Sequence, residues 1–194
     1  LPAGARVLDA CAAPGGKTAQ LLERADLDLL ALDSDPRRVP RIHDTLHRLH
    51  LHAEVKAADA RQTAAWWDGR SFDAILLDAP CTASGIVRRH PDIRWLRRAD
   101  DLSALTRMQS ELLQALWPLL KPGGRLVYAT CSIFKAEGQQ QIDAFLQRLP
   151  AGSARLDPAS PGHLLPLADN RQPGAPTGTR VPQDGFYYAL IHKT

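Results

Sequence analysis

The sequence predicts an α/β fold in which one mostly parallel, seven-stranded sheet carries helices on both faces. Two observations predict this class. Strand-like and helix-like patterns alternate along the chain, and such alternation implies parallel strands joined by crossover helices. A glycine-containing turn also joins the first strand to the first helix, as in doubly wound sheets. With 194 residues of ordinary globular composition, the chain is expected to form one domain over 1–194.

In the first half of the chain, short apolar runs predict strands and longer segments predict helices. The run "RVLDA" precedes the glycine turn, and "LDLLALD" follows the first helix. Pro40 falls near the first turn of the second helical segment, so the sequence does not define the first residue of that helix. The expected elements are strands at 6–10, 27–33 and 53–59, a helix from Lys17 and a helix over 35–49.

In the second half, "FDAILLD" at 72–78 is dense enough in apolar residues for a central strand that is buried on both faces. Residues 105–120 carry leucine and methionine at helical spacing, and "KPGG" ends this helix before a strand at 125–131. The remaining expected elements are a helix at 137–147, a surface loop rich in proline and glycine over 151–183, and a closing strand at 185–192.

The turn "DACAAPGGKT" ends in letters that suggest a phosphate-binding P-loop. The P-loop pattern needs a glycine five residues before Gly16, where the chain has Cys11, and the dinucleotide pattern needs one at Ala13. Both patterns fail, but a glycine turn before a helix still offers backbone N–H groups to a nucleoside-like cofactor. Asp33, about 20 residues further on, is placed to accept hydrogen bonds from ribose hydroxyls, as NAD and S-adenosylmethionine both require.

All three cysteines, Cys11, Cys81 and Cys131, follow predicted strands at the edge where ligands collect in such sheets. Asp59 and Asp78 share that edge. No C-x-x-C pair is present, so we expect no metal site, and an odd cysteine count without an export signal indicates reduced thiols in the cytoplasm. No apolar run approaches the ~20 residues of a membrane span, so we expect no membrane contact.

Arginine is concentrated in two places, although the formal net charge is only +3. The stretch "RRHPDIRWLRR" sets five arginines against one aspartate, and tryptophan and proline interrupt it, which favours contact with a polyanion. Its candidate contact residues are Arg88, Arg89, His90 and Arg94. The second cluster mixes arginines and histidines on the 35–49 segment, and there we favour a solvent-exposed basic face.

Together, "DACAAPGGKT", "DAPC", "RRHPDIRW" and "ATCS" resemble the RNA 5-methylcytosine methyltransferases of the class I, S-adenosylmethionine-dependent type, and the similarity extends to "DGFYYALI". The resemblance implies a Rossmann-like class I methyltransferase fold and methyl transfer to carbon 5 of a cytosine in RNA, with 16S ribosomal RNA as the expected substrate. Members usually carry an N-terminal helical RNA-binding domain that is missing here, so we expect 1–194 to be the catalytic domain. We also expect a cytoplasmic monomer.

The resemblance assigns roles to the residues at the ligand edge. Cys131 is the implied nucleophile, and Cys81 is the thiol that assists product release. Asp78 is assigned to the methyl end of the cofactor and to the target cytosine, Asp33 to the ribose and Asp59 to the adenine region. The turn assigned to the methionine part of the cofactor comprises Cys11, Ala12, Ala13, Pro14, Gly15, Gly16 and Lys17.

The implied chemistry explains these residue types. Carbon 5 of cytosine is a poor nucleophile until a thiolate adds to carbon 6 and turns the ring into an enamine. A free thiol is only a few per cent thiolate at neutral pH, so Cys131 needs activation, which we expect from the arginine-rich stretch. An acid such as Asp78 near the ring stabilises developing charge, and the target base must be single-stranded or flipped out.

Three alternatives stay open from sequence. A class I methyltransferase for a small molecule or a protein needs the turn and Asp33 but neither two edge thiols nor an arginine-rich stretch. A catalytically silent RNA-binding subunit of the same fold has no need of Cys131. An NAD-dependent oxidoreductase is disfavoured because position 13 is not glycine.

Overall fold

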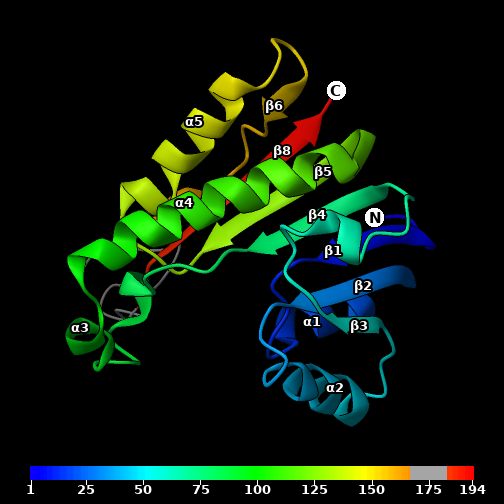
Figure 1. Cartoon of the computed structure of the whole chain (residues 1–194), viewed down its shortest axis with the longest axis horizontal. Coiled ribbons are helices and arrows are strands. Elements are labelled where there is room, and N and C mark those ends of the chain that lie inside the picture. Colours follow the sequence, from blue (N-terminus) through cyan, green and yellow to red (C-terminus); the bar gives the residue numbers. More distant parts are fainter. Residues whose placement is uncertain (167–182) are drawn as a thin grey trace, which may run out of the picture.

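The computed structural model describes residues 1–166 and 183–194, which build one eight-stranded sheet flanked by helices (Figure 1). The strand order is β3-β2-β1-β4-β5-β8-β6, with β7 paired to β8 off this path. The strands are β1 (Ala5–Asp9), β2 (Leu27–Asp33), β3 (Glu54–Ala57), β4 (Phe72–Asp78), β5 (Leu120–Thr130), β6 (Ala154–Leu156), β7 (Gly162–Leu164) and β8 (Phe186–Lys193). The helices are α1 (Gly16–Arg24), α2 (Val39–Arg48), α3 (Ile93–Leu96), α4 (Ala99–Leu116) and α5 (Gln139–Arg148), with 3₁₀ turns η1 (Thr63–Ala65), η2 (Ser84–Ile86), η3 (Trp117–Leu119) and η4 (Lys135–Glu137).

Alternate residues of the central strands pack into two separate apolar clusters. Val7 and Leu29 belong to the cluster under α1 and α2, whereas their neighbours Leu8 and Leu30 belong to the cluster under α4 and α5. Figure 1 shows these two helix pairs on opposite sides of the sheet. Because both faces are covered, the strands need apolar side chains at successive positions, as their continuous apolar runs predict. The predicted α/β class with helices on both faces is confirmed.

The strand order places a topological switch point between β1 and β4. The chain winds from β1 outward through β2 to β3, then returns to β4 on the other side of β1 and continues to β5. Strands β1 to β5 are mutually parallel, whereas β8 is antiparallel to β5. In open sheets of this kind, ligands bind beyond the carboxyl ends of the strands that flank the switch point. The turns after β1 and β4 therefore define the edge where a site is expected.

Helix α4 starts earlier and ends earlier than predicted. It begins at Ala99 because the Asp101 carboxylate accepts a hydrogen bond from the Arg98 backbone N–H (2.9 Å) and caps the first turn. It ends at Leu116, and Pro118 lies in the 3₁₀ turn that follows. The break predicted at "KPGG" lies inside β5, where the pairing with β4 shifts register.

Two further predictions differ from the structure. Helix α2 begins at Val39, four residues later than predicted, because the carboxylates of Asp33 and Asp35 each accept a backbone N–H and fold the preceding segment into a polar turn. The loop predicted over 151–183 is wrong at β6 and β7, two three-residue strands that pair with β8. The sheet therefore has eight strands, where seven were predicted and six were located by residue range. Residues 167–182 of that loop lie outside the described residues.

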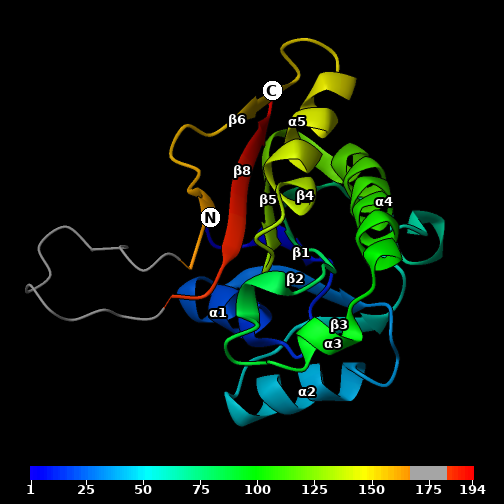
Figure 2. The same ribbon diagram turned by 90° about the vertical axis from the view of Figure 1, so that its left-hand side faces the viewer.

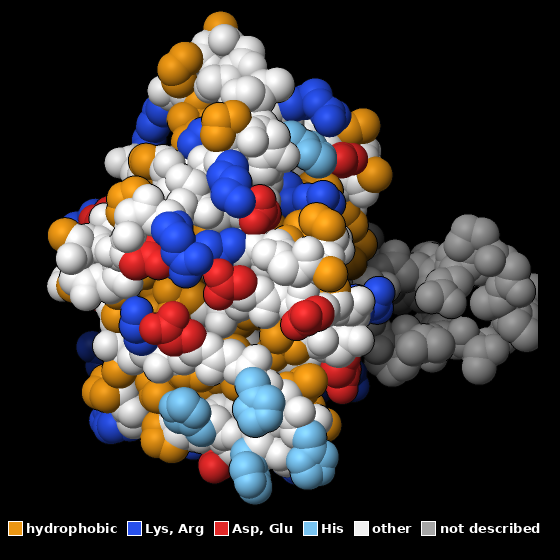
Figure 3. All heavy atoms as spheres, turned by 90° about the vertical axis from the view of Figure 1, so that its right-hand side faces the viewer, with side chains coloured by type: hydrophobic (Ala, Val, Ile, Leu, Met, Phe, Trp, Pro, Cys, Tyr) orange, Lys and Arg blue, Asp and Glu red, His pale blue; other side chains and the backbone are white. Residues whose placement is uncertain are grey.

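The histidine-rich cluster lies on a solvent-exposed surface around α2 (Figure 3). Its histidine side chains are exposed, whereas Ile42 and Leu46 of the same helix are buried. This placement supports the interpretation of a solvated basic face. Within residues 1–166 and 183–194, no group of three or more histidine, cysteine or acidic side chains is arranged to hold a metal ion. No helix in those ranges has the length and apolar character to cross a membrane.

Candidate active site

The turn after β1 is built around a glycine that no other residue replaces easily. Gly15 has φ of 98°, in the left-handed region, and a Cβ there would lie 3.1 Å from the Ile42 Cα of α2. Its backbone N–H donates to the Ala12 carbonyl (2.6 Å), and the Ala12 N–H donates to the Leu32 carbonyl of β2 (2.8 Å). The turn is therefore fixed to both α2 and β2 before any ligand binds.

The predicted cofactor residues meet in two adjoining hollows that share Cys11. One, of about 180 Å³, is lined by the turn together with Lys17 and Asp78. The other, of about 70 Å³, is lined by Asp33 and Asp59. Of the residues assigned to the cofactor from sequence, all except Gly15 line one of the hollows, because Gly15 faces α2 instead.

Asp33 and Asp59 are each held by neighbouring groups. The Asp33 side chain is buried, accepts a hydrogen bond from the Ala13 N–H (3.1 Å), and forms an ion pair with Arg38 (3.5 Å), so it braces the turn as well as facing the hollow. Asp59 pairs with Arg61 at 2.7 Å, and hydrogen bonds from Arg61 lower the pKa of the Asp59 carboxyl. Both carboxylates are therefore fixed acceptors at the edge of the site.

Asp9 is a site residue that the sequence analysis missed. It is the last residue of β1, is 1% exposed, and accepts a hydrogen bond from the Thr18 hydroxyl (2.7 Å) on one oxygen. Its other oxygen, Oδ1, is buried without a hydrogen-bond partner among the described residues. Burial raises the pKa of this carboxyl to about 6. An unpartnered carboxylate oxygen at the wall of the 180 Å³ hollow fits the ammonium group of an amino-acid-like ligand such as S-adenosylmethionine.

The turns after β4 and β5 bring two thiols into contact. The strands pair in register up to Asp78 opposite Ala129, and the Sγ atoms of Cys81 and Cys131 lie 3.4 Å apart. A hydrogen bond from the Cys81 thiol lowers the pKa of Cys131 below its ordinary value. The same contact and burial raise the pKa of Cys81. Cys131 is therefore the thiol of the pair that is poised to ionise, while Cys81 holds the proton.

The activation of Cys131 comes from a different source than predicted. The leading causes of the lowered pKa of Cys131 include no arginine of the 88–98 stretch: the Cys81 hydrogen bond lowers it most, burial and Asp78 raise it, and Lys17 lowers it. Lys17 lies in α1 and its Nζ atom is 2.5 Å from the Asp78 carboxylate. Cys11, the third edge thiol, is different: burial and then the nearby Asp9 carboxylate raise its pKa, so it stays a neutral part of the wall.

Glu137 anchors the thiol-bearing turn and was also missed from sequence. It is fully buried, and its carboxylate accepts hydrogen bonds from the Thr82 backbone N–H (2.9 Å), the Thr82 hydroxyl (2.5 Å) and the Gln109 amide (3.2 Å). The same Gln109 amide donates to the Pro80 carbonyl (2.8 Å). Residues on both sides of Cys81 are thus tied to η4 and α4, which fixes that sulfur opposite Cys131.

Two of the predicted RNA-contacting arginines are ion-paired in the structure. Arg88 and Arg89 both approach the carboxylate of the buried Asp184, at 3.3 and 2.5 Å. His90 and Arg94 are exposed. The four residues therefore lie on one connected segment beside the thiol-bearing turns, but two of them already have an anionic partner within the chain.

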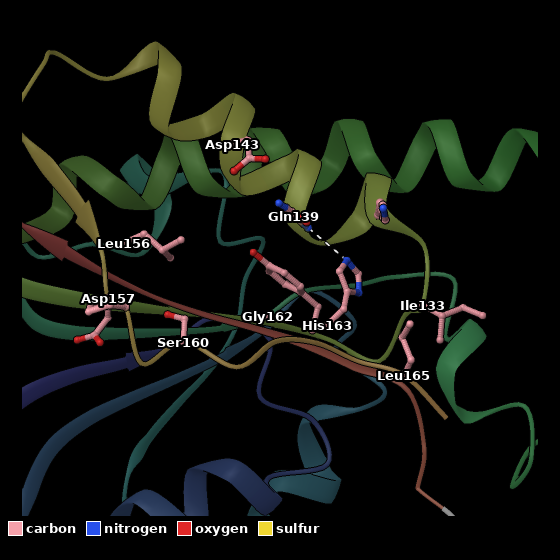
Figure 4. Close-up of a pocket in the computed structure, with 12 residues that line it drawn as sticks. Ile133, Gln139, Asp143, Leu156, Asp157, Ser160, Gly162, His163 and Leu165 are labelled. Carbon is pink, nitrogen blue, oxygen red and sulfur yellow. Dashed lines mark hydrogen bonds between the residues drawn. The ribbon is translucent and has the colours of Figure 1, made fainter. Parts of the chain in front are cut away.

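A separate hollow of about 430 Å³ lies between α5, β7 and β8 (Figure 4). It is lined by Gln139, Asp143, His163 and Tyr187, and the Gln139 N–H donates to His163 Nε2 (3.4 Å). None of the cofactor or thiol residues lines it. It is therefore distinct from the candidate active site.

Four features together define a class I methyltransferase: the sheet order, the glycine turn after β1, the acid at the end of β2, and the thiol pair on the turns after β4 and β5. The chain belongs to the family described as 16S rRNA methyltransferase RsmB/F, whose model matches residues 2–192. Members of that family use S-adenosylmethionine as methyl donor.

Individual relatives agree with this membership. The chain is 52% identical, over 98% of its length, to ribosomal RNA small subunit methyltransferase B of Vibrio cholerae, and 52% identical, over all of it, to the protein of that name from Xanthomonas campestris. It spans 42% and 44% of those two proteins, so it corresponds to less than half of the curated relatives' length.

Solved structures show the same fold. A methyltransferase homologue from Pyrococcus horikoshii superposes over the whole chain with a TM-score of 0.75 at 31% identity, and the chain covers 63% of it. NSun6 from the same organism, solved with SFG, superposes over 97% of the chain with a TM-score of 0.77 at 27% identity, and the chain covers 48% of it. The predicted class I methyltransferase fold is confirmed.

The raised pKa of Asp9 implies that the stability of the protein depends on pH. Because its folded pKa of about 6 lies above the ordinary 3.8, the neutral form favours folding; this contribution is full below pH 4 and is lost as the pH rises through 6. Between pH 4 and 7.5, the unfolding free energy of the native protein should therefore fall relative to Asp9→Asn by up to about 3 kcal/mol. Urea titrations across that range measure the difference.

The exposed Asp26→Asn variant is the matched control and should show no such pH trend relative to the native protein. A constant difference between the native protein and Asp9→Asn at every pH would contradict the assignment of a buried, unpartnered carboxylate.

Glu137 should act by positioning the thiols and not by holding the cofactor. Glu137→Ala removes the acceptor of two buried donors of Thr82 and leaves its backbone N–H unpaired, so we expect the unfolding free energy to fall by about 2–3 kcal/mol and kcat for methyl transfer to fall at least tenfold. The Kd for S-adenosylmethionine, measured by calorimetry, should stay within about twofold because Glu137 lines neither hollow. Glu137→Gln keeps an acceptor oxygen and should recover part of kcat.

The exposed Glu23→Ala variant serves as control and should leave both quantities unchanged. Parallel losses of kcat and cofactor affinity in Glu137→Ala would indicate general loosening of the fold instead of positioning.

Proposed function

We propose that the protein transfers a methyl group from S-adenosylmethionine to carbon 5 of a cytosine in 16S ribosomal RNA, through a covalent bond between Cys131 and carbon 6. The single observation that carries this proposal is the sulfur contact of 3.4 Å between Cys81 and Cys131, beside Asp78 and the hollow lined by the glycine turn. Membership of the RsmB/F family and relatives named as ribosomal RNA methyltransferases support the substrate.

The residues present fit the cofactor. S-adenosylmethionine, when bound, supplies an electrophilic methyl group carried on a sulfonium centre. Asp9 Oδ1 and the turn are suited to the amino-acid part, Asp33 to ribose hydroxyls, and Asp59 to the adenine region. Asp78 lines the hollow of the turn and lies on β4 next to the thiol-bearing segment, so it connects the cofactor side with the cytosine side.

Cys131 begins the reaction on the cytosine ring. Its thiolate adds to carbon 6, and the electron pair of the broken carbon 5–carbon 6 double bond makes carbon 5 nucleophilic enough to take the methyl group. The lowered pKa of Cys131 increases the thiolate fraction at neutral pH. Asp78, fixed by Lys17, is the group available to stabilise charge on the ring.

Cys81 completes the cycle. After methyl transfer, carbon 5 must lose its proton so that the bond between Cys131 and carbon 6 breaks and the sulfur leaves as a thiolate. The Cys81 proton lies within hydrogen-bonding reach of that sulfur and stabilises it as a leaving group. Cys81 thus promotes the departure of the product. A cytoplasmic location and a monomeric state remain predictions.

The two thiols should respond differently to substitution, which tests the proposed function. The native protein, incubated with methyl-labelled S-adenosylmethionine and 16S rRNA, should yield labelled 5-methylcytidine on nuclease digestion. Cys131→Ala should yield none, while its cofactor Kd is unchanged. Cys81→Ala should accumulate a protein–RNA adduct that survives denaturing electrophoresis, and that adduct should form with a pH dependence shifted upward because the Cys131 thiolate loses its donor.

Glu23→Ala is the control, since that exposed side chain lies outside both hollows and the thiol pair. Label in another nucleoside would overturn the proposed reaction. An adduct that forms in Cys131→Ala and not in Cys81→Ala would reverse the two roles.

Contacts between arginines and phosphates should appear in the salt dependence of RNA binding. Each phosphate contact to single-stranded RNA contributes about 0.7 to the slope of log K against log salt. Arg94→Ala should flatten the slope by about that amount. The Arg88→Ala, Arg89→Ala double variant should flatten it by less than the 1.4 or so expected for two free arginines, because Asp184 already neutralises part of their charge. Unchanged slopes in both variants would indicate a merely solvated face.

A further inference from the structure

Large apolar side chains are exposed mainly on the two segments that carry the thiols. Among the described residues, six large hydrophobic side chains are exposed, and four of these follow β4 or β5 at the carboxyl edge: Trp95, Leu96, Ile133 and Phe134. Trp95 is the extreme case at 85% exposed, whereas Trp66 and Trp117 are buried. Covering an exposed indole with a partner removes apolar surface from water, and this favours binding.

Trp95 lies on a segment held by hydrogen bonds, residues 85–97, which we call the arm. Successive backbone hydrogen bonds run from Ile86 to Arg97, including one from the Trp95 N–H to the Asp92 carbonyl (2.9 Å). At one end of the arm, the Gly85 N–H donates to the Cys131 carbonyl (2.9 Å). At the other end, Arg97 Nε donates to the Thr82 carbonyl (2.8 Å). Both ends are therefore fixed to the thiol-bearing turns, and Figures 1 and 2 show α3 at that edge of the sheet.

The positive charge around Trp95 indicates which class of molecule would bind there. The stretch 88–98 holds five arginines and one aspartate. Within the described part of the chain, Arg94 forms no ion pair, and it is exposed next to Trp95. An aromatic face flanked by cations is the combination that binds single-stranded nucleic acid, because bases stack on the ring and phosphates meet the cations. A protein partner would favour an apolar patch with fewer like charges.

We propose that Trp95 stacks on an unpaired nucleobase of the RNA next to the target cytosine, with Arg94 on the adjoining phosphate. The inference deepens the proposed function, on which it rests, by naming how the substrate strand is held. Stacking is sequence-tolerant, since every base has a π-face, so Trp95 holds the strand in an open, unstacked form instead of reading its sequence. This suits a reaction that needs the target base out of a helix.

The test measures steady-state methylation of 16S rRNA by the full chain. Because Trp95 contacts no reacting atom, Trp95→Ala should raise the KM for RNA between about 5- and 150-fold while kcat changes less than about twofold. Trp95→Phe retains an aromatic face and should recover most of the lost affinity. Leu96→Ala removes an apolar neighbour on the same helix that is also exposed, at 65%, and should change KM less than about twofold.

Fluorescence gives a readout that does not depend on catalysis. Adding unlabelled single-stranded RNA should quench the emission of the native protein, and Trp95→Phe should lose that quenching, because two of the other tryptophans are buried and the third is partly buried. If RNA quenched the emission of the native protein but was not methylated by it, the proposed function would be contradicted and the stacking contact would still be supported.

Two results would overturn the stacking contact. One is an unchanged KM in Trp95→Ala together with unchanged quenching in Trp95→Phe. The other is an equal loss of affinity for RNA in Trp95→Ala and Leu96→Ala with no recovery in Trp95→Phe, which would show that the packing of this segment, and not a base stacked on the indole, supports RNA binding.

Discussion

The pairing of β4 with β5 is the constraint on which the rest of the site depends. Because Asp78 lies opposite Ala129, the two strands end level, and the short turns that follow bring Cys81 within 3.4 Å of Cys131. Neither turn has regular structure that would hold a sulfur in place by itself. The distance is instead maintained by two sets of hydrogen bonds: Thr82, after β4, donates to the buried Glu137 carboxylate, and the Cys131 carbonyl, after β5, accepts from the Gly85 N–H. A one-residue slip in this register would separate the thiols and end the chemistry.

Two buried acids near these strands, Glu137 and Asp9, have different roles. Glu137 accepts from three donors, and its removal would leave the buried Thr82 backbone N–H unpaired, so it stabilises the fold as well as the site. Asp9 has one oxygen without a partner and a raised pKa, so it costs stability at neutral pH. A protein tolerates such a cost at a site where a ligand satisfies the group. The two carboxylates thus distinguish the supporting frame from the surface proposed to bind the cofactor.

Sequence patterns predicted the parts of the site that depend on short spacing. The glycine turn, Asp33 and the edge thiols all follow strands directly, so the parallel sheet brings them together as expected. Contacts between distant segments were not accessible in this way. The pairing of Arg89 with Asp184 joins residues 95 positions apart, and the burial of Glu137 depends on how α4 packs, which no local pattern encodes. The strands β6 and β7 were missed because three residues are too few to show a period.

The central claim is that Cys131, activated by Cys81, forms the bond to cytosine. The most direct measurement uses RNA with 5-fluorocytidine at the target position, because fluorine at carbon 5 cannot be removed as a proton and the covalent complex persists after methyl transfer. Mass spectrometry of the digested complex should find the methylated nucleotide on the peptide that contains Cys131. Attachment to the peptide containing Cys81, or methylation without any covalent complex, would contradict the claim.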